Sequence, residues 1–358
     1  MSWRYWSVST ADWTSKVRVT PSSFPWARAL NVGKGGQATF LLSDPEVAET
    51  ATRDTMASWK RLLVNEFQGQ IVYAGFIINT DYDHDTQTLT VDHEDFWAVL
   101  ARRIMVNILE FGVEKTRLTY TGRSLSNLIT EAMYQGQNDA ARFNLPIVLP
   151  TADEPGPETR TYWGYLLPTV ADILREIIDT ENGPDFDPFP RWLGSQVEWF
   201  ARIGDLRDGV WEWDVSAPDS QVSGLVERRD GSNMANRVAA IGEGSEKKMK
   251  VSVTDSSDVS SFLPLDATTS YKDEKSQTRL AARARADRRA RQQATVQTSM
   301  DVQMDGEFAV HQLRLGGTVK WRTQGDPWFT DGWHSSRLIE FSGDMTNKIH
   351  LEFQTEGA

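Results

Sequence analysis

The sequence predicts an α+β fold that is mainly β, with two small antiparallel β-barrels, an inserted α/β domain and a helical insertion. Three observations predict it. Short alternating apolar runs, separated by turn residues, fill the first hundred and the last fifty residues, as is typical of antiparallel sheet. Two amphipathic helix patterns lie between them, and a long stretch is rich in alanine and arginine. A chain of 358 residues is also too long for one ordinary core, so several compact units are expected.

The first predicted β-barrel covers residues 1–110. Apolar runs with polar turns between them predict a meander of strands at 37–42, 58–67, 71–78 and 86–91. The period then changes at Asp92, which can cap a short helix carrying Phe96, Trp97 and Leu100, with Asp95 at the reciprocal capping position.

The predicted mixed α/β domain covers residues 111–222. Ser124 can cap a helix with one apolar stripe, and Thr169 can cap a second helix that ends at Asn182-Gly183-Pro184. The segment 146–157 is rich in proline and acids and is expected to be a surface loop. Strands are predicted at 197–203 and 210–215.

The second predicted β-barrel is split, because residues 223–268 and 308–358 flank a helical insertion at 269–307. Within the insertion, residues 271–293 contain neither glycine nor proline and predict a long helix. The strands expected in this barrel lie at 237–241, 247–253, 308–315, 318–321, 335–342 and 347–354.

The amino-acid composition argues against several classes of function. Lysine and arginine number 38 against 50 acids, a net charge of −12, so no basic field is available for stable binding of nucleic acid. The absence of cysteine excludes disulfides and thiolate metal sites, and fits assembly in a reducing cytoplasm. No signal-peptide pattern and no run of eighteen apolar residues occurs, so we expect a soluble, unexported protein without stable membrane insertion.

Motifs for catalysis, cofactors and metals are missing, so no catalytic, cofactor-binding or metal-binding residue is predicted. The five histidines lack zinc-site spacing, and no phosphate loop or nucleophile elbow occurs. Residues 81–92 half resemble a calcium loop, but the sixth position is Thr86 and the last is Asp92. A hairpin turn is the simpler interpretation.

Two further patterns invite a functional interpretation. The acid pairs Asp185/Asp187 and Glu212/Asp214 could form a glycosidase couple, although fifty acids provide many such pairs by chance. The fourteen tryptophans favour a core or a subunit interface, since several lie in alternating strand patterns; stacking on sugars is the rival interpretation.

Positive charge is concentrated in the predicted long helix. Its arginines could form a subunit interface, because the planar guanidinium pairs with carboxylates of an acidic neighbour. A solvated helix whose side chains cover sheet is an equally good interpretation, and nucleic-acid binding is a distant third. The candidate interface residues are Arg279, Arg283, Arg285, Arg288 and Arg289.

Several segments, taken in order, resemble a known family. They are residues 71–77, the helix exit 181–187, Asn236-Arg237-Val238 before Ile241-Gly242, Asp331-Gly332-Trp333 and 336–339. Their order is similar to the baseplate hub family of phage tails and related injection machines, and the sequence resembles minor tail proteins of actinobacteriophages with siphovirus-like tail tips. The helical insertion is more basic than that resemblance leads us to expect, and Gly325-Asp326 precedes Pro327-Trp328 instead of a valine strand.

This resemblance implies a structural virion protein without enzymatic activity. It implies a homotrimer whose two tube-type barrels per subunit form a pseudo-sixfold ring, adapting the sixfold tail tube to a threefold tip. The implied partners are the distal tail protein ring, the tape measure protein, other tail-tip or receptor-binding proteins, and genomic DNA in transit. The protein would assemble in the host cytoplasm and lie at the distal end of the tail. The alternatives are a cell-wall glycan-binding module and a cell-wall hydrolase.

Overall fold

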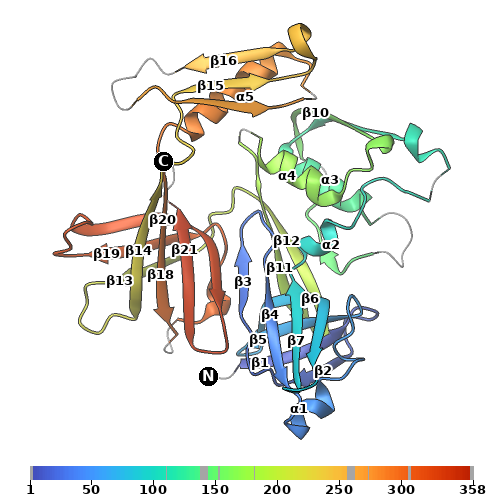
Figure 1. Cartoon of the computed structure of the whole chain (residues 1–358), viewed down its shortest axis with the longest axis vertical. Helices are drawn as coiled ribbons and strands as arrows, with labels where there is room; N and C mark the ends of the chain where they lie inside the picture. Colours follow the sequence, from blue (N-terminus) through green and yellow to red (C-terminus); the bar gives the residue numbers. More distant parts are fainter. Residues whose placement is uncertain are drawn as a thin grey trace. The chain divides into compact units, whose positions relative to one another are not determined.

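Figure 1 shows the chain as a computed structural model, which describes residues 3–109, 111–137, 144–151, 154–180, 182–255, 263–272, 274–304 and 308–354. Strands dominate and the helices are short, so the prediction of an α+β, mainly β fold is confirmed. The chain forms two compact units. The first unit comprises residues 1–224 and 300–353, and the second comprises residues 225–299 and 354–358.

A six-stranded antiparallel sheet fills the N-terminal part of the first unit. Its hydrogen-bonded order is β2-β1-β5-β6-β7-β4, and the predicted strands 37–42, 58–67, 71–78 and 86–91 correspond to β4 to β7. This order ends at β2 and β4, so closure into a barrel is not confirmed and stays a prediction. The strands are β1 (Trp3–Ser9), β2 (Lys16–Val19), β4 (Gly35–Leu41), β5 (Arg61–Phe67), β6 (Gln70–Asp83) and β7 (Thr88–Glu94), with helix α1 (Pro45–Thr50) after β4.

The β6–β7 hairpin settles two sequence predictions. The Asp83 carboxylate accepts hydrogen bonds from the backbone N–H of Asp85 (2.8 Å) and Thr86 (3.1 Å), so the acidic segment is a hairpin turn, as predicted. The predicted cap at Asp92 is wrong, because β7 continues to Glu94. Instead, Asp95 accepts from Trp97 N (3.0 Å) before the short helix α2 (Trp97–Leu100).

Two capped helices confirm predictions for the middle of the chain. In α3 (Leu125–Gln135) the Ser124 hydroxyl accepts from Asn127 N (3.0 Å), and in α4 (Val170–Ile178) the Thr169 hydroxyl accepts from Asp172 N (3.1 Å). Their apolar faces join the large core of the first unit.

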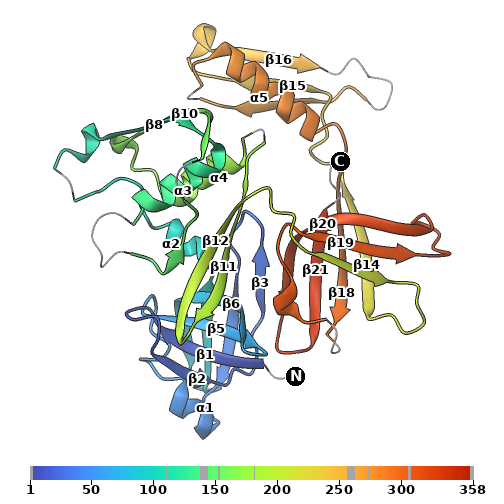
Figure 2. The same cartoon turned by 180° about the vertical axis from the view of Figure 1, so that it is seen from behind.

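Two small sheets accompany these helices (Figure 2). Strands β8 (Arg117–Arg123) and β10 (Pro155–Trp163) form one, with the 3₁₀ helices η1 (Val113–Lys115) and η3 (Gly164–Leu166) at one end. The other has the order β11-β12-β9. Its strands are β9 (Ile147–Val148), β11 (Asp185–Leu193) and β12 (Gln196–Gly204), and β11 was not predicted because Pro188 and Pro190 argue against a strand. As an edge strand, β11 tolerates both prolines.

The C-terminal sheet has the order β13-β19-β20-β21-β18-β14. Strand β3 (Trp26–Ala29) pairs with the end of β20, so an N-terminal segment is part of this sheet. The predicted strand at 308–315 is wrong: its apolar residues are buried around the 3₁₀ helix η5 (Val310–Gln312). The remaining strands are β13 (Val210–Asp214), β14 (Val222–Asp230), β18 (Thr295–Gln303), β19 (Thr318–Thr323), β20 (Gly332–Gly343) and β21 (Lys348–Gln354).

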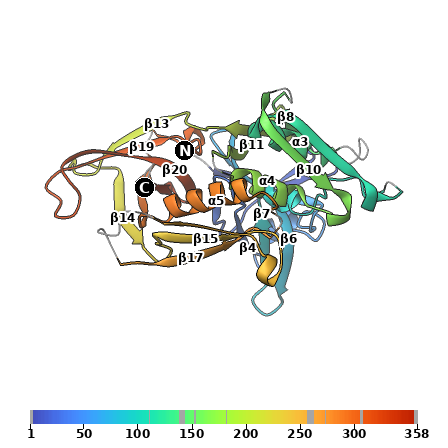
Figure 3. The same cartoon turned by 90° about the horizontal axis from the view of Figure 1, so that it is seen from above.

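The second unit contains helix α5 (Gln277–Ala290), which packs on a three-stranded sheet (Figure 3). The predicted helix at 271–293 is shorter than expected, because the Ser276 hydroxyl caps it by accepting from Arg279 N (3.3 Å). The sheet order is β16-β15-β17, and the domain boundaries predicted around it stay predictions. The elements are β15 (Arg237–Ile241), η4 (Glu246–Lys248), β16 (Val251–Asp255) and β17 (Asp266–Ser270).

In the parts of the chain that the structure describes, every helix is too short or too polar to cross a lipid bilayer.

Candidate functional site

A buried charge network joins β3, β11 and β12. Arg28 on β3 and Arg202 on β12 both donate to the Asp187 carboxylate on β11, at 2.6 Å and 2.7 Å. All three side chains are nearly inaccessible to solvent. Arg202 also donates to the carbonyl of Leu315 (3.2 Å) and to Asp208, so its guanidinium contacts three segments at once.

Asp185, the other acid of β11, extends the network to β20. Asp185 accepts from the Asn31 amide (3.0 Å), from Leu206 N (3.2 Å) and from the guanidinium of Arg337. Arg337 also donates to the Leu206 carbonyl (3.0 Å). The β11–β12 hairpin therefore meets strands β3 and β20 of the C-terminal sheet through ionic hydrogen bonds. We call residues 28, 185, 187, 202 and 337 the junction network.

These contacts decide against the glycosidase interpretation of Asp185 and Asp187. Asp187 accepts from two buried guanidinium groups, and Asp185 accepts from the partly exposed guanidinium of Arg337. Removing one partner of such a pair is costly, because the remaining charge is left without its counter-charge. The other pair is also engaged, because Glu212 accepts from Lys320 (2.9 Å) and Asp214 from Arg322 (3.1 Å) across β13 and β19. Glu212 and Asp214 line a hollow beside β13, but the ion pairs to Lys320 and Arg322 occupy both carboxylates.

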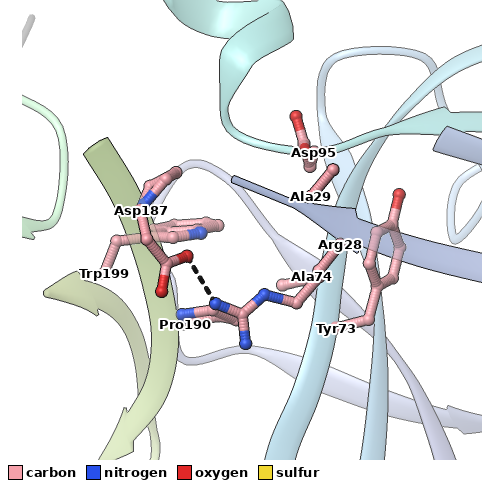
Figure 4. A pocket seen from close by; sticks show the side chains of 9 residues that line it. Arg28, Ala29, Tyr73, Ala74, Asp95, Asp187, Pro190 and Trp199 are labelled. Atoms are coloured by element: carbon pink, nitrogen blue, oxygen red, sulfur yellow. Dashed lines mark hydrogen bonds and ion pairs between the residues drawn. The ribbon is translucent and has the colours of Figure 1, made fainter. Parts of the chain in front are cut away.

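The cavity beside the junction network is small (Figure 4). Arg28, Asp187, Tyr73, Asp95 and Trp199 are among its lining residues, and its volume is about 10 Å³. A volume of that size holds at most one water molecule. The cavity is a packing defect next to a polar network and does not offer room for a ligand.

Asp95 is half-buried at this cavity, and His93 is buried behind Tyr73, which lines it. Burial raises the pKa of Asp95 to about 7, although its carboxylate accepts from Lys34 N (2.8 Å) and Trp97 N (3.0 Å). Burial lowers the pKa of His93 to about 4, and its Nδ1 shares a hydrogen bond with the Tyr73 hydroxyl (2.9 Å). At neutral pH His93 is therefore uncharged.

The predicted arginine surface lies on α5, and the structure brings only part of it together. Arg279 donates to buried Glu274 (3.2 Å), and the guanidinium of Arg283 lies 3.8 Å from the same carboxylate and 4.7 Å from the Tyr271 ring centre. Arg285 and Arg289 are exposed, and Arg288 is half-buried. A role for these five residues in a subunit interface stays a prediction.

Sequence reasoning missed the arginines of the junction network. One signal was available, because Arg28 stands between alanines in the apolar stretch Trp26–Ala29, where an unpaired charge would be costly. Its partner is 159 positions away, so no local pattern could identify it. No group of three or more side chains suited to a metal ion occurs among the residues described.

Comparison with known proteins relates this architecture to phage tails. No protein-family model matches the sequence, and no curated protein does. A solved 43 kDa tail protein from prophage MuSo2 of Shewanella oneidensis has a TM-score of 0.63 at 8% identity, covering 99% of this chain and 98% of its own. A tail protein from Neisseria meningitidis MC58 has a TM-score of 0.59 at 12% identity, covering 100% and 98%.

A third solved structure agrees. Prophage tail protein gp18 from Listeria monocytogenes EGD-e has a TM-score of 0.54 at 9% identity, and the match covers 99% of this chain and 95% of that one. At such low identity the likeness is one of fold. The resemblance to phage tail proteins that the sequence indicated is thus confirmed: this chain has the fold of phage tail proteins along nearly its whole length.

Proposed function

We propose that this chain is a structural protein of a bacteriophage tail, the hub at the distal end of the tail tube. The observation that carries the proposal is the extent of the likeness, because three tail proteins share the fold over at least 95% of their own length. A shared fold alone does not assign function. Agreement with three tail proteins over nearly the whole of each chain makes the tail role the best supported one.

The junction network supports a load-carrying role. It connects the β11–β12 hairpin to strands β3 and β20 of the C-terminal sheet through ionic hydrogen bonds, and β3 adds a strand of the N-terminal region to that sheet. Buried pairs of this kind can specify one arrangement of segments. A protein that must hold a fixed shape within an assembly benefits from such a joint.

The finer proposal follows the family resemblance. Three copies form a ring in which each contributes two tube-type barrels, one from residues 1–110 and one from 223–268 with 308–358. The ring binds the sixfold distal tail protein above it and contacts the tape measure protein and other tip proteins. An acidic chain repels DNA, so genomic DNA could pass without being retained.

An experiment on whole particles tests this proposal. Light scattering gives the mass of the purified chain, and electron microscopy of intact virions locates it in the tail. A ring with threefold symmetry at the distal end of the tube supports the hub. A monomer at the periphery of the tip, with no part in the ring, overturns it.

One observation favours the alternative of a glycan-binding module. Trp328 and Trp333, near the turn between β19 and β20, are 67% and 56% exposed, and exposed tryptophan rings stack well on sugars. Retention of the purified chain on cell walls, lost on Trp328→Ala and Trp333→Ala, would support that alternative. Retention unchanged by both substitutions would oppose it.

A further inference from the structure

Two neighbouring loops of the first unit expose an unusual amount of apolar surface. Phe111 is fully exposed and Leu109 is 69% exposed, while Tyr165 and Leu166 are 59% and 64% exposed. Contiguous apolar exposure of this kind marks interaction sites. We call these residues the apolar tip, which consists of Ile108, Leu109, Phe111, Tyr165, Leu166 and Leu167.

The two loops are fixed side by side at one end of the β8–β10 pair. Gly164 N donates to the carbonyl of Thr116 (2.8 Å), and Trp163 pairs with Arg117 in the strand register. A Cβ atom at Gly164 would lie 1.8 Å from the carbonyl oxygen of Val113, so only glycine permits this approach. The tip is therefore a built surface of two packed loops.

The size of the tip matches a protein interface. At 150–250 Å² per aromatic side chain, the exposed fractions of Phe111 and Tyr165 together offer roughly 300 Å². The four aliphatic residues of the tip add to this, and each partner in a standard interface contributes about 800 Å². A lipid surface is a poorer match, because the chain outside residues 225–299 carries 24 basic and 40 acidic residues, a net charge of −16 that anionic lipids repel.

A complementary surface lies on the same chain. A hollow of about 460 Å³ lies beside β13 and η5. The Trp213 and Phe308 rings in its wall are buried and pack edge to face at 5.4 Å. Its lining is mixed: Val210 and Trp211 are apolar, and the polar residues are Glu212, Asp214, Asp219, Ser220, Gln221 and Gln312. We call it the tryptophan hollow.

Carboxylates stand at the rim of the tryptophan hollow. Among the residues described, Asp219 there has no ion-pair partner, whereas Glu212 pairs with Lys320. The apolar tip is flanked by Glu114 and by the cations Lys115 and Arg117. Aromatic side chains can therefore enter the hollow while flanking cations approach its acidic rim.

The segments that carry the tip and the hollow lie apart within the first unit. In Figures 1 and 3, the teal segment of η1 and strand β13 lie at opposite sides. One copy cannot join them, but two copies can in a head-to-tail contact. Repeated contacts of this heterologous type close into a ring when the rotation allows it.

We propose that the apolar tip of one copy docks in the tryptophan hollow of the next copy. This inference rests on the proposed hub function and names the surfaces that join neighbouring subunits. Phe111 is the central side chain of the contact, and Lys115 approaches Asp219 at its rim.

Substitution of the tip provides the first test. Phe111→Asp should weaken self-association of the purified chain at least tenfold, measured by light scattering over a concentration series. Tyr82→Asp is the matched control, because Tyr82 is 48% exposed on β6 and lies outside both surfaces. Equal self-association of wild type and Phe111→Asp overturns the proposal. Flotation with vesicles of anionic and zwitterionic lipid that Phe111→Asp abolishes would also overturn it, in favour of a lipid surface.

Cross-linking tests the predicted pairing directly, since the chain contains no cysteine. The double variant Leu166→Cys with Ala217→Cys should give, on mild oxidation of assembled tails, a ladder of covalent multimers that ends at the ring. Each single variant should give dimers at most.

Two results of the same experiment separate this contact from the hub function. A threefold ring in tails whose double variant gives no ladder overturns the tip contact and leaves the hub proposal standing. Tails without any ring of this chain overturn both.

Discussion

The two compact units of the chain differ in how their interiors are built. The first unit has a large aromatic core in which Trp199, Phe76 and Phe96 contact one another at ring distances of 4.8 to 6.4 Å. The second unit has a small described core of Ala240, Leu280 and Ala284, with Tyr271 packed against it. Apolar burial therefore stabilises the first unit far more than the second.

Charge separates the units in the same way. Residues 225–299 carry 14 basic and 10 acidic residues, a net charge of +4, against −16 for the rest of the chain. Where a core is small, helix propensity, caps and ion pairs contribute a larger share of stability. The comparison indicates that the first unit is stabilised by a large apolar core and that the second is a weakly stabilised basic element, and each prediction below tests one side of that contrast.

The largest effect is expected in the junction network. Asp187→Ala leaves the guanidiniums of Arg28 and Arg202 buried without their acceptor, and should destabilise the first unit by about 3–5 kcal/mol. Urea unfolding followed by tryptophan fluorescence measures it, because all fourteen tryptophans lie outside 225–299. Arg207→Ala is the control: its ion pair with Asp205 is exposed, so its loss should cost under about 1 kcal/mol. Equal effects of the two substitutions would contradict the assigned role of the network.

Local chemistry explains what the sequence predicted well. Ser124 and Thr169 cap α3 and α4 as expected, because a capping hydroxyl and an apolar stripe are signals within one helix. Strands β4 to β7 were found because alternation and turns are likewise local. The prediction that Asp92 caps a helix was wrong, because aspartate also occurs in strands. Only the pairing of β7 with β6 decides between a cap and a strand residue.

The junction network and β3 could not be predicted in the same way. Asp185 and Asp187 look like any other acids in a chain with fifty, and their partners Arg337 and Arg28 lie more than 150 positions away. Long-range pairing depends on the completed fold, which no window of sequence contains. The apolar tip could not be predicted either, because the exposure of Phe111 depends on which parts of the folded chain pack against its loop.

His93, which is buried, and Asp95, which is half-buried, predict a pH response of the first unit. The pKa of His93 falls from 6.5 to about 4, so its contribution to stability is present above pH 6.5 and is lost as pH falls to about 4. The pKa of Asp95 rises from 3.8 to about 7, so its contribution is present below pH 3.8 and is lost as pH rises to about 7. Between about pH 4 and 6.5 the two effects oppose each other.

Substitution of His93 separates these effects. Relative to the wild type, His93→Gln should gain at most about 3 kcal/mol of unfolding free energy as pH falls from 6.5 to 4, because the Asp95 contribution then acts alone. Tryptophan fluorescence during urea unfolding at several pH values measures it. His84→Gln, in the exposed β6–β7 turn, is the control. A pH profile of His93→Gln parallel to that of the wild type would refute the assignment of the loss of stability at low pH to His93.

A smaller effect is expected in the core of the second unit. Leu280→Ala removes the largest aliphatic side chain of that core and should cost about 2–3 kcal/mol, enough to unfold a weakly stabilised element. Protease cleavage within 225–299 should increase, while the fluorescence transition of the first unit stays unchanged. A coincident shift of the fluorescence transition would show that the two units unfold together.

The smallest effect on stability is expected on the outer face of α5. Arg285 is exposed and has no ion-pair partner among the residues described, so Arg285→Glu should change the unfolding free energy by under about 0.5 kcal/mol. If α5 lies against an acidic neighbouring subunit, the same substitution should weaken self-association several-fold at low salt, and added salt should remove the difference. Lys247→Glu, exposed in η4 of the same unit, makes an equal change of charge away from the helix. Equal self-association of both variants at low salt would leave the arginines of α5 as solvated side chains that stabilise a helix with little core beneath it.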